Sequence, residues 1–117
     1  MDKDTITLRT KTWIVDENKD TLFGAGQLKI LETIERTGSI SAAAKEMKMG
    51  YRSMWGRIRK VEQRTGKSLL IRHKGGSDGG RSELTEDAKL MVSRFKALQQ
   101  RIDDAAQDIF HAIYFPE

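Results

Sequence analysis

The side chains that could do chemistry in this chain are mostly basic, and they gather in its middle third. Residues 45–81 hold eleven Lys and Arg against three Asp and Glu, a net charge of +8. The flanking segments are slightly acidic, with net charges of −1 for 1–44 and −3 for 82–117. A local excess of cations is the electrostatic footprint of a protein that binds nucleic acid, although a solvated basic surface would give the same count. The distribution therefore favours nucleic acid as the partner.

Within the basic segment, residues 51–65 have the pattern of an amphipathic helix. Met54, Ile58 and Val61 recur at spacings of four and three, which predicts one buried stripe. A helix that is apolar on one side and basic on the other, after a short helix, is typical of one that enters the major groove of double-stranded DNA. Arg52 could pair with both acceptors of a guanine. We expect DNA contacts from Ser41, Tyr51, Arg52, Ser53, Trp55, Arg57, Arg59, Lys74 and Arg81.

Some of these side chains also have purely structural interpretations. Tyr51 could pack on the preceding helix, and Ser53 could be an ordinary helix-surface residue. Trp55 lies beside the apolar stripe, so packing at the edge of the core is favoured over contact with DNA. In the strand that follows, Arg72 could contact DNA or bridge to an acid such as Glu62.

Catalytic and metal chemistry find no support in the sequence. There is no cysteine, and the only histidines, His73 and His111, share no ligand spacing. Gly66-Lys67-Ser68 resembles a phosphate-binding loop, but Val61 stands where that loop requires glycine. No secretory signal or membrane-crossing run is visible either. We therefore expect that the protein is not an enzyme and binds no metal or cofactor. We also expect it to be cytoplasmic and nucleoid-associated.

Capping residues and glycines indicate where the helices begin and end. Ser41 is expected to cap the short helix before the turn, and Thr85 the last helix. Gly38 and Gly66 are expected to stop the helices that they follow. Gly56 lies inside a predicted helix, where glycine costs about 1 kcal/mol relative to alanine, which suggests close approach of the backbone to DNA or to another helix.

These elements predict a mainly α fold with small β hairpins, a winged helix-turn-helix in a single domain. The length of 117 residues suits one such domain. Two strand-like segments flank a glycine-rich tip after the helix-turn-helix, which is the arrangement of a wing. The expected parts are an N-terminal hairpin (5–23), the helix-turn-helix (27–66), the wing (68–84) and a long helix (85–113) within the domain 1–117.

The last helix carries a second apolar pattern, with two series of residues seven apart and offset by three. A helix of about 28 residues would be about 42 Å long, and a small domain has little core with which to cover it. We expect this seam to pair with a second copy, although a helix folded onto its own domain is the alternative. The predicted dimerisation residues are Ala88, Met91, Phe95, Leu98, Ile102, Ala105 and Ile109.

Four features of the chain together form a recognisable signature: Gly38-Ser-Ile-Ser-x-x-Ala44, Tyr51-Arg52-Ser53-x-Trp55-x-x-Ile58, the glycine-rich tip and Leu84-Thr85. With them the chain resembles the LysR-type winged helix-turn-helix, and more closely the N-terminal domain of ModE-type, molybdate-responsive regulators. The resemblance covers about residues 5–113. It implies a homodimeric, sequence-specific transcriptional regulator whose reading helices enter successive major grooves of a palindromic operator. The N-terminal strands and the long helix would form the dimer.

The sequence departs from that family after Glu117, where ModE proteins continue into molybdate-binding domains. We therefore expect that this chain alone does not bind molybdate tightly, and that an effector-sensing partner protein, another mode of regulation, or a longer parent protein accounts for the difference. Two other functional classes stay open. One is a winged-helix module that binds proteins, and the other is a non-specific nucleoid-associated protein.

Overall fold

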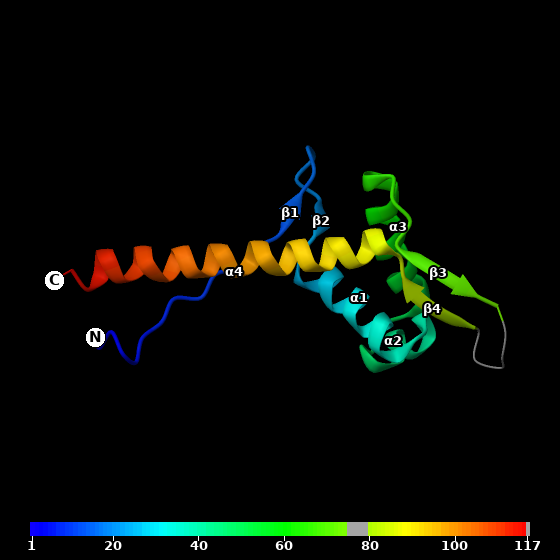
Figure 1. Cartoon of the computed structure of the whole chain (residues 1–117), viewed down its shortest axis with the longest axis horizontal. Helices are drawn as coiled ribbons and strands as arrows, with labels where there is room; N and C mark the ends of the chain where they lie inside the picture. The colour runs from blue at the N-terminus through cyan, green and yellow to red at the C-terminus, as the bar shows by residue number, and fades with distance from the viewer. Residues whose placement is uncertain (75–79, 117) are drawn as a thin grey trace.

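The computed structural model describes residues 1–74 and 80–116, in which four helices and two antiparallel hairpins alternate (Figure 1). The predicted mainly α winged helix-turn-helix is confirmed. A globular head contains three of the helices and the wing, and the last helix projects from it toward the C-terminus (Figure 1). The elements are β1 (Ile14–Val15), β2 (Thr21–Phe23), α1 (Ala25–Thr37), α2 (Ile40–Glu46), α3 (Tyr51–Thr65), β3 (Leu70–His73), β4 (Arg81–Leu84) and α4 (Glu86–Tyr114).

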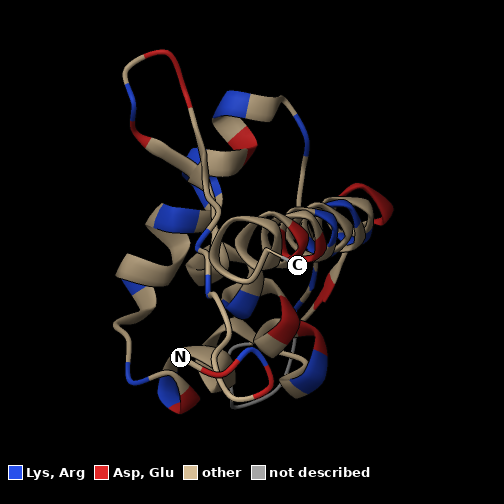
Figure 2. Ribbon diagram, turned by 90° about the vertical axis from the view of Figure 1, so that its left-hand side faces the viewer, with Lys and Arg blue, Asp and Glu red and all other residues tan. Residues whose placement is uncertain are grey.

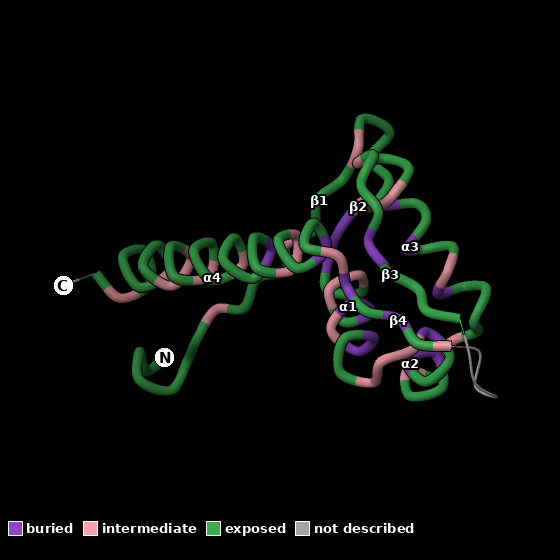
Figure 3. The backbone as a smooth tube through the Cα atoms, turned by 45° about the vertical axis from the view of Figure 1, so that its right-hand side comes forward, coloured by how far each residue is buried: buried purple, intermediate pink, exposed green. Residues whose placement is uncertain are grey.

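The core lies where α1, α2, α3 and the wing meet the first turns of α4 (Figure 3). Helix α1 contributes an apolar stripe at helical spacing, which includes Ile30, Leu31 and Ile34. Phe23 of β2 and Phe95 of α4 close the core in an edge-to-face contact, with ring centroids 5.1 Å apart. This packing fixes α3 against the head through its own buried stripe, Met54, Ile58 and Val61.

Most predicted helix ends are confirmed, and one cap is corrected. Gly38 and Gly66 end α1 and α3 in the left-handed region, at φ of +82° and +70°. The Thr85 hydroxyl accepts from the Ala88 N–H at 3.1 Å and caps α4. The cap of α2 is Ser39 and not Ser41, because its extended backbone lets the hydroxyl accept from the Ala42 N–H at 2.9 Å. Helix α2 therefore begins at Ile40, ahead of the expected start.

The N-terminal hairpin is shorter than predicted. Strand pairing is limited to β1 and β2, and the alternating residues before Trp13 form no strand. Part of this segment instead lies along α4, where the Gln107 side chain accepts from the Thr7 hydroxyl at 2.9 Å and donates to the Leu8 carbonyl. The alternating β-branched residues predict a strand, but a strand needs a partner to pair with, and among the described residues β2 pairs only with β1.

The wing is hydrogen-bonded to the helix-turn-helix. Strands β3 and β4 pair antiparallel, with Leu70 opposite Leu84 and His73 opposite Arg81. The Ser82 N–H donates to the Gly38 carbonyl at 2.8 Å, which links the wing to the turn between α1 and α2. The predicted glycine-rich tip lies largely outside the described residues.

The apolar seam of α4 is divided between two environments, which corrects the prediction of one dimerisation surface. Ala88 and Phe95 are 0% and 3% exposed, because they complete the core of their own domain, and Met91 packs at its edge. Farther along the helix, Leu98, Ile102 and Ile109 are 39%, 37% and 59% exposed. Only this second half of the seam is open to a partner.

Candidate nucleic-acid interface

Helix α3 presents two opposite stripes, one to the core and one to solvent. The buried stripe is Met54, Ile58 and Val61. Moving each position back by two residues turns it about 200° around the helix and gives Arg52, Gly56 and Arg59, all exposed. Lysine and arginine, in blue, recur along α3 at the left of Figure 2. The sequence pattern thus places two guanidinium groups on the side of α3 that faces away from the protein.

Gly56 lies between these two arginines and leaves the middle of the stripe flat. A Cβ built on Gly56 would meet no atom within 4 Å. Within the chain, the predicted close approach to another helix is therefore wrong, and only an external surface such as DNA could come close to the backbone here. Ser53 is also exposed on α3 and fits either of its two interpretations.

Arg57 lies toward one flank of α3, beside the N-terminus of α1. A Cβ built on Gly26 would lie 3.6 Å from the Arg57 Nη1. Arg57, Lys60 and Lys11 line a shallow hollow around the first turn of α1. Among the described residues, neither Arg52, Arg57 nor Arg59 forms an ion pair, so their positive charge is not neutralised by the rest of the head.

On the opposite flank, the wing reaches α3 through Arg72. Its guanidinium carbon lies 4.8 Å from the centroid of the Trp55 ring, and its Nη2 donates to the Tyr51 hydroxyl at 3.2 Å. Trp55 is half-buried and packs against the core, as its structural interpretation predicts. Tyr51 is 41% exposed and its hydroxyl meets the wing.

The proposed bridge between Arg72 and Glu62 is wrong. The Glu62 carboxylate accepts from the Leu69 N–H at 2.9 Å and so joins α3 to the base of the wing. The cluster of Arg72 with Tyr51 and Trp55 was missed by the sequence analysis. A signal for it exists, because the period of two along a strand puts Arg72 on the same face as buried Leu70, toward α3.

The other predicted contact residues lie around α2 and the wing. Ser41 is exposed on α2, and together with Lys45 and Arg81 it lines an open hollow between α2 and the wing. Lys74 is exposed just beyond β3. The structure therefore brings Ser41 and Arg81 together and places Lys74 beside the described end of the wing.

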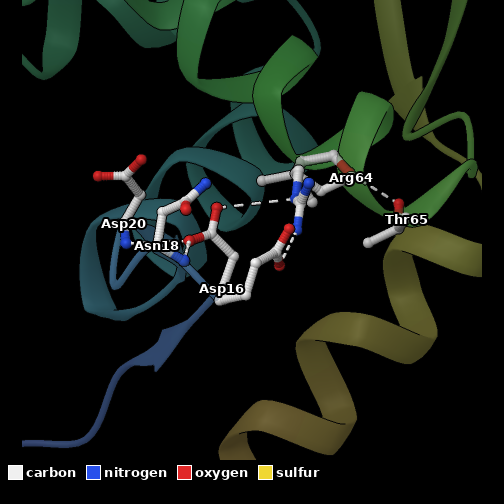
Figure 4. Close-up of polar contacts among 7 residues, drawn as sticks. Asp16, Asn18, Asp20, Arg64 and Thr65 are labelled. Carbon is white, nitrogen blue, oxygen red and sulfur yellow. Dashed lines mark hydrogen bonds and ion pairs between the residues drawn. The ribbon is translucent and has the colours of Figure 1, made fainter.

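Ion pairs tie down the end of α3 that lies farthest from Arg52. Arg64 pairs with Asp16 at 3.7 Å and with Glu17 in the turn of the N-terminal hairpin (Figure 4). The backbone N–H of Asp20, then that of Asn18 and the charge of Arg64, lower the pKa of Asp16 below its ordinary value. Arg64 is thus a structural residue at the junction of the hairpin and α3.

The described residues (1–74 and 80–116) contain neither a cluster of metal ligands nor a membrane-spanning helix. No group of three or more His, Cys, Asp or Glu side chains there could hold a metal ion. No helix in that part of the chain is long and apolar enough to cross a membrane.

The amino-acid sequence of the chain is similar to those of several ModE proteins. The chain is 32% identical over 85 residues to the molybdenum transport protein ModE of Azotobacter vinelandii, covering 73% of this chain and 32% of that protein. It is 31% identical over 83 residues to the DNA-binding transcriptional dual regulator ModE of Escherichia coli K12, covering 71% and 31%. The chain spans about a third of the length of these relatives. They confirm the resemblance to ModE-type regulators.

Solved structures show the same fold. The CbnR DBD–DNA complex superposes with a TM-score of 0.53 at 24% identity, covering 72% of this chain and 94% of that one. Vibrio fischeri DarR in complex with DNA gives a TM-score of 0.55 at 20% identity, covering 81% and 31%. Residues 25–89 match the family described as bacterial regulatory helix-turn-helix protein, lysR family. This family comprises regulators and not enzymes, in agreement with the sequence prediction, and the chain belongs to it.

Proposed function

We propose that the chain regulates transcription by binding double-stranded DNA in a sequence-dependent manner, with α3 in the major groove. The observation that carries the proposal is the solvent-facing stripe of Arg52, Gly56 and Arg59, which lies opposite the buried stripe and has no ion pair within the described residues. Membership of the lysR family supports it, as do two neighbours of the same fold that are bound to DNA. Chromosomal DNA as the target would place the chain at the nucleoid, in the cytoplasm.

The positions of the side chains suggest a division of roles. Arg52 lies near the start of α3, where base edges are usually reached, and can form a bidentate pair with guanine. Ser53 and Arg59 extend this surface along α3. Phosphate contacts are proposed for the residues on its flanks, Ser41, Arg57, Lys74 and Arg81. Trp55 acts mainly by supporting Arg72, whose guanidinium lies over its ring.

A homodimer is proposed through the distal half of α4. Leu98, Ile102 and Ile109 are exposed at spacings of four and seven along one side of the helix, and Ala105 between them is also exposed. Exposed large apolar side chains in a row favour burial against a partner. Ala88 and Phe95 are excluded from this interface by their burial in the head. Two-fold symmetry would require an operator with two inverted half-sites.

The proposal is tested by selecting duplexes from a random pool with the purified chain, followed by titration of the selected and scrambled sequences. We expect the double variant Arg52→Ala and Arg59→Ala to lose the preference for the selected duplex. Lys89→Ala is the matched control, because Lys89 is a basic residue on α4 that pairs with Glu86. A chain that binds selected and scrambled duplexes equally would be a non-specific nucleoid protein, and one that binds neither would favour a protein-interaction module.

A further inference from the structure

Arg72 connects the wing to the reading helix by two contacts made with one guanidinium group. It stacks over the Trp55 ring at 4.8 Å and donates through Nη2 to the Tyr51 hydroxyl at 3.2 Å. A planar guanidinium can do both at once, because its face lies on the ring while its edge carries the N–H donors. Lysine has no such plane. The geometry therefore uses a property that is specific to arginine.

The two partners of Arg72 differ in burial. Trp55 is half-buried and packs against the core, so it holds the stacked guanidinium in place. Tyr51 is the first residue of α3 and is 41% exposed, and its hydroxyl accepts from Arg72 of the wing. Arg72 forms no ion pair with an acid among the described residues, which leaves the hydroxyl as its recorded polar partner.

Acceptance of this hydrogen bond constrains what Tyr51 can do next. A phenol has one proton and accepts through its oxygen lone pairs. When the oxygen accepts from Arg72, its own proton must point elsewhere, and the nearby positive charge makes it a stronger donor. Tyr51 directly precedes Arg52, so this donor lies at the end of α3 proposed to read bases.

We propose that Arg72 is a positioning residue for DNA recognition, which holds the Tyr51 hydroxyl as a donor to an acceptor on a base edge of the cognate site. The inference rests on the proposed DNA binding by α3. It gives the wing a role in sequence preference through a side chain that need not touch a base. A phosphate contact made by Arg72 itself is the competing explanation.

A double-mutant cycle separates the two explanations. The variants are Arg72→Ala, Tyr51→Phe and their combination, with affinities measured on cognate and scrambled duplexes. Each single change should weaken cognate binding up to about tenfold, the upper end for one net hydrogen bond, and should change scrambled binding by less than about twofold. The affinity of the double variant should lie within about twofold of that of either single variant, because each single change already costs the same hydrogen bond to the base.

Two controls sharpen the cycle. Arg72→Lys keeps the charge but loses the stacked plane, and it should behave like Arg72→Ala. Arg59→Ala combined with Tyr51→Phe should give independent losses. Thermal melts should show each variant to be folded.

Losses from Arg72→Ala and Tyr51→Phe that multiply, a full rescue by lysine, or equal weakening on both duplexes would overturn the role of Arg72. Failure of the unmodified chain to prefer any duplex would instead overturn the proposed function.

Discussion

At the scale of single residues, a substitution of Gly56 should affect the stability of the fold and the affinity for DNA in opposite directions. Outside the neighbouring helix backbone, a Cβ at this position meets no described atom within 4 Å, and alanine is favoured over glycine inside a helix by about 1 kcal/mol. Gly56→Ala should therefore raise the melting temperature by a few degrees. It should also weaken binding to the cognate duplex, because the added methyl lies between Arg52 and Arg59. Calorimetry and titration of the same preparation measure both effects, and a stabilised variant with unchanged affinity would mean that DNA does not approach the backbone here.

Arg52 and Lys74 should differ in the kind of binding that they support. Arg52→Ala is expected to cost about 1–3 kcal/mol on the cognate site and to relax preference at one or two base pairs. Lys74→Ala should weaken cognate and scrambled duplexes alike and reduce the slope of log affinity against log salt by about one. Titrations at several salt concentrations distinguish them. Equal effects of Arg52→Ala on both duplexes would identify Arg52 as a phosphate contact.

The sequence predicted buried positions better than partners. Met54, Ile58 and Val61 are buried as their spacing requires, because helical periodicity is a local property. The contact of Arg72 with Tyr51 joins a strand to a helix 21 positions earlier. The strand period predicts the face on which Arg72 lies, but its partner depends on how the wing folds back onto α3, which no local pattern encodes. Ile71 added a misleading signal, because it is apolar and yet 43% exposed.

At the scale of elements, the junction between the N-terminal hairpin and α3 should be sensitive to acid. The pKa of Asp16 is lowered in the folded chain, chiefly by the Asp20 N–H, so the unfolded chain binds the proton more tightly. Stability from Asp16 is then present above the ordinary pKa of aspartate and is lost as the pH falls below about 4. We expect Asp16→Asn to melt with a smaller drop between pH 7 and pH 3 than the unmodified chain.

Asp20→Asn is the matched control for this pH series, because the Asp20 carboxylate accepts no hydrogen bond among the described residues. Its melting temperature should follow that of the unmodified chain. Should Asp16→Asn and Asp20→Asn give the same pH profile as the unmodified chain, the Asp16 contacts contribute nothing measurable to folding.

Charges placed on the two halves of α4 should have different effects, dissociation of the dimer in one case and unfolding of the head in the other. Ile102→Glu with Ile109→Glu should leave the head folded and yield a monomer, since both side chains are exposed in one chain. Phe95→Glu should unfold the head, because a buried unpaired charge is strongly destabilising. Ala97→Glu, on an exposed face away from the seam, is the control. Sedimentation and circular dichroism give the readouts, and an unmodified chain that is monomeric at micromolar concentration would rule out the dimer.

The cap of α2 and the seam of α4 depend on more than local sequence patterns. Thr85 was predicted as a cap and is one, but at α2 two serines were available, and Ser39 has the extended backbone that the cap requires. The division of the α4 seam could not be predicted, because a heptad pattern is the same whether the helix packs on its own domain or on a partner. Tertiary packing of Phe95 on Phe23 decided it.

At the scale of the whole molecule, DNA binding should be steeply dependent on salt. A dimer that makes about six to ten phosphate contacts should lose about 10³–10⁵ in affinity between 50 and 200 mM salt. Selected sites should show a dyad with half-sites about one helical turn apart, or a multiple of it. Footprinting and fluorescence titration measure these properties. An affinity that is flat in salt, or sites without a dyad, would contradict the proposed mode of binding.

Because α4 is one uninterrupted helix, it fixes the rotation of the exposed seam relative to the head. Each residue turns the helix by about 100° and advances it by about 1.5 Å. Removal of one residue between Phe95 and Ile102 would therefore rotate the distal face by about 100° relative to α3, whereas insertion of seven would lengthen the helix by about 10 Å with a rotation of only about 20°. In the proposed dimer, the number of residues in α4 between the head and the seam would then determine the angular offset between the operator half-sites.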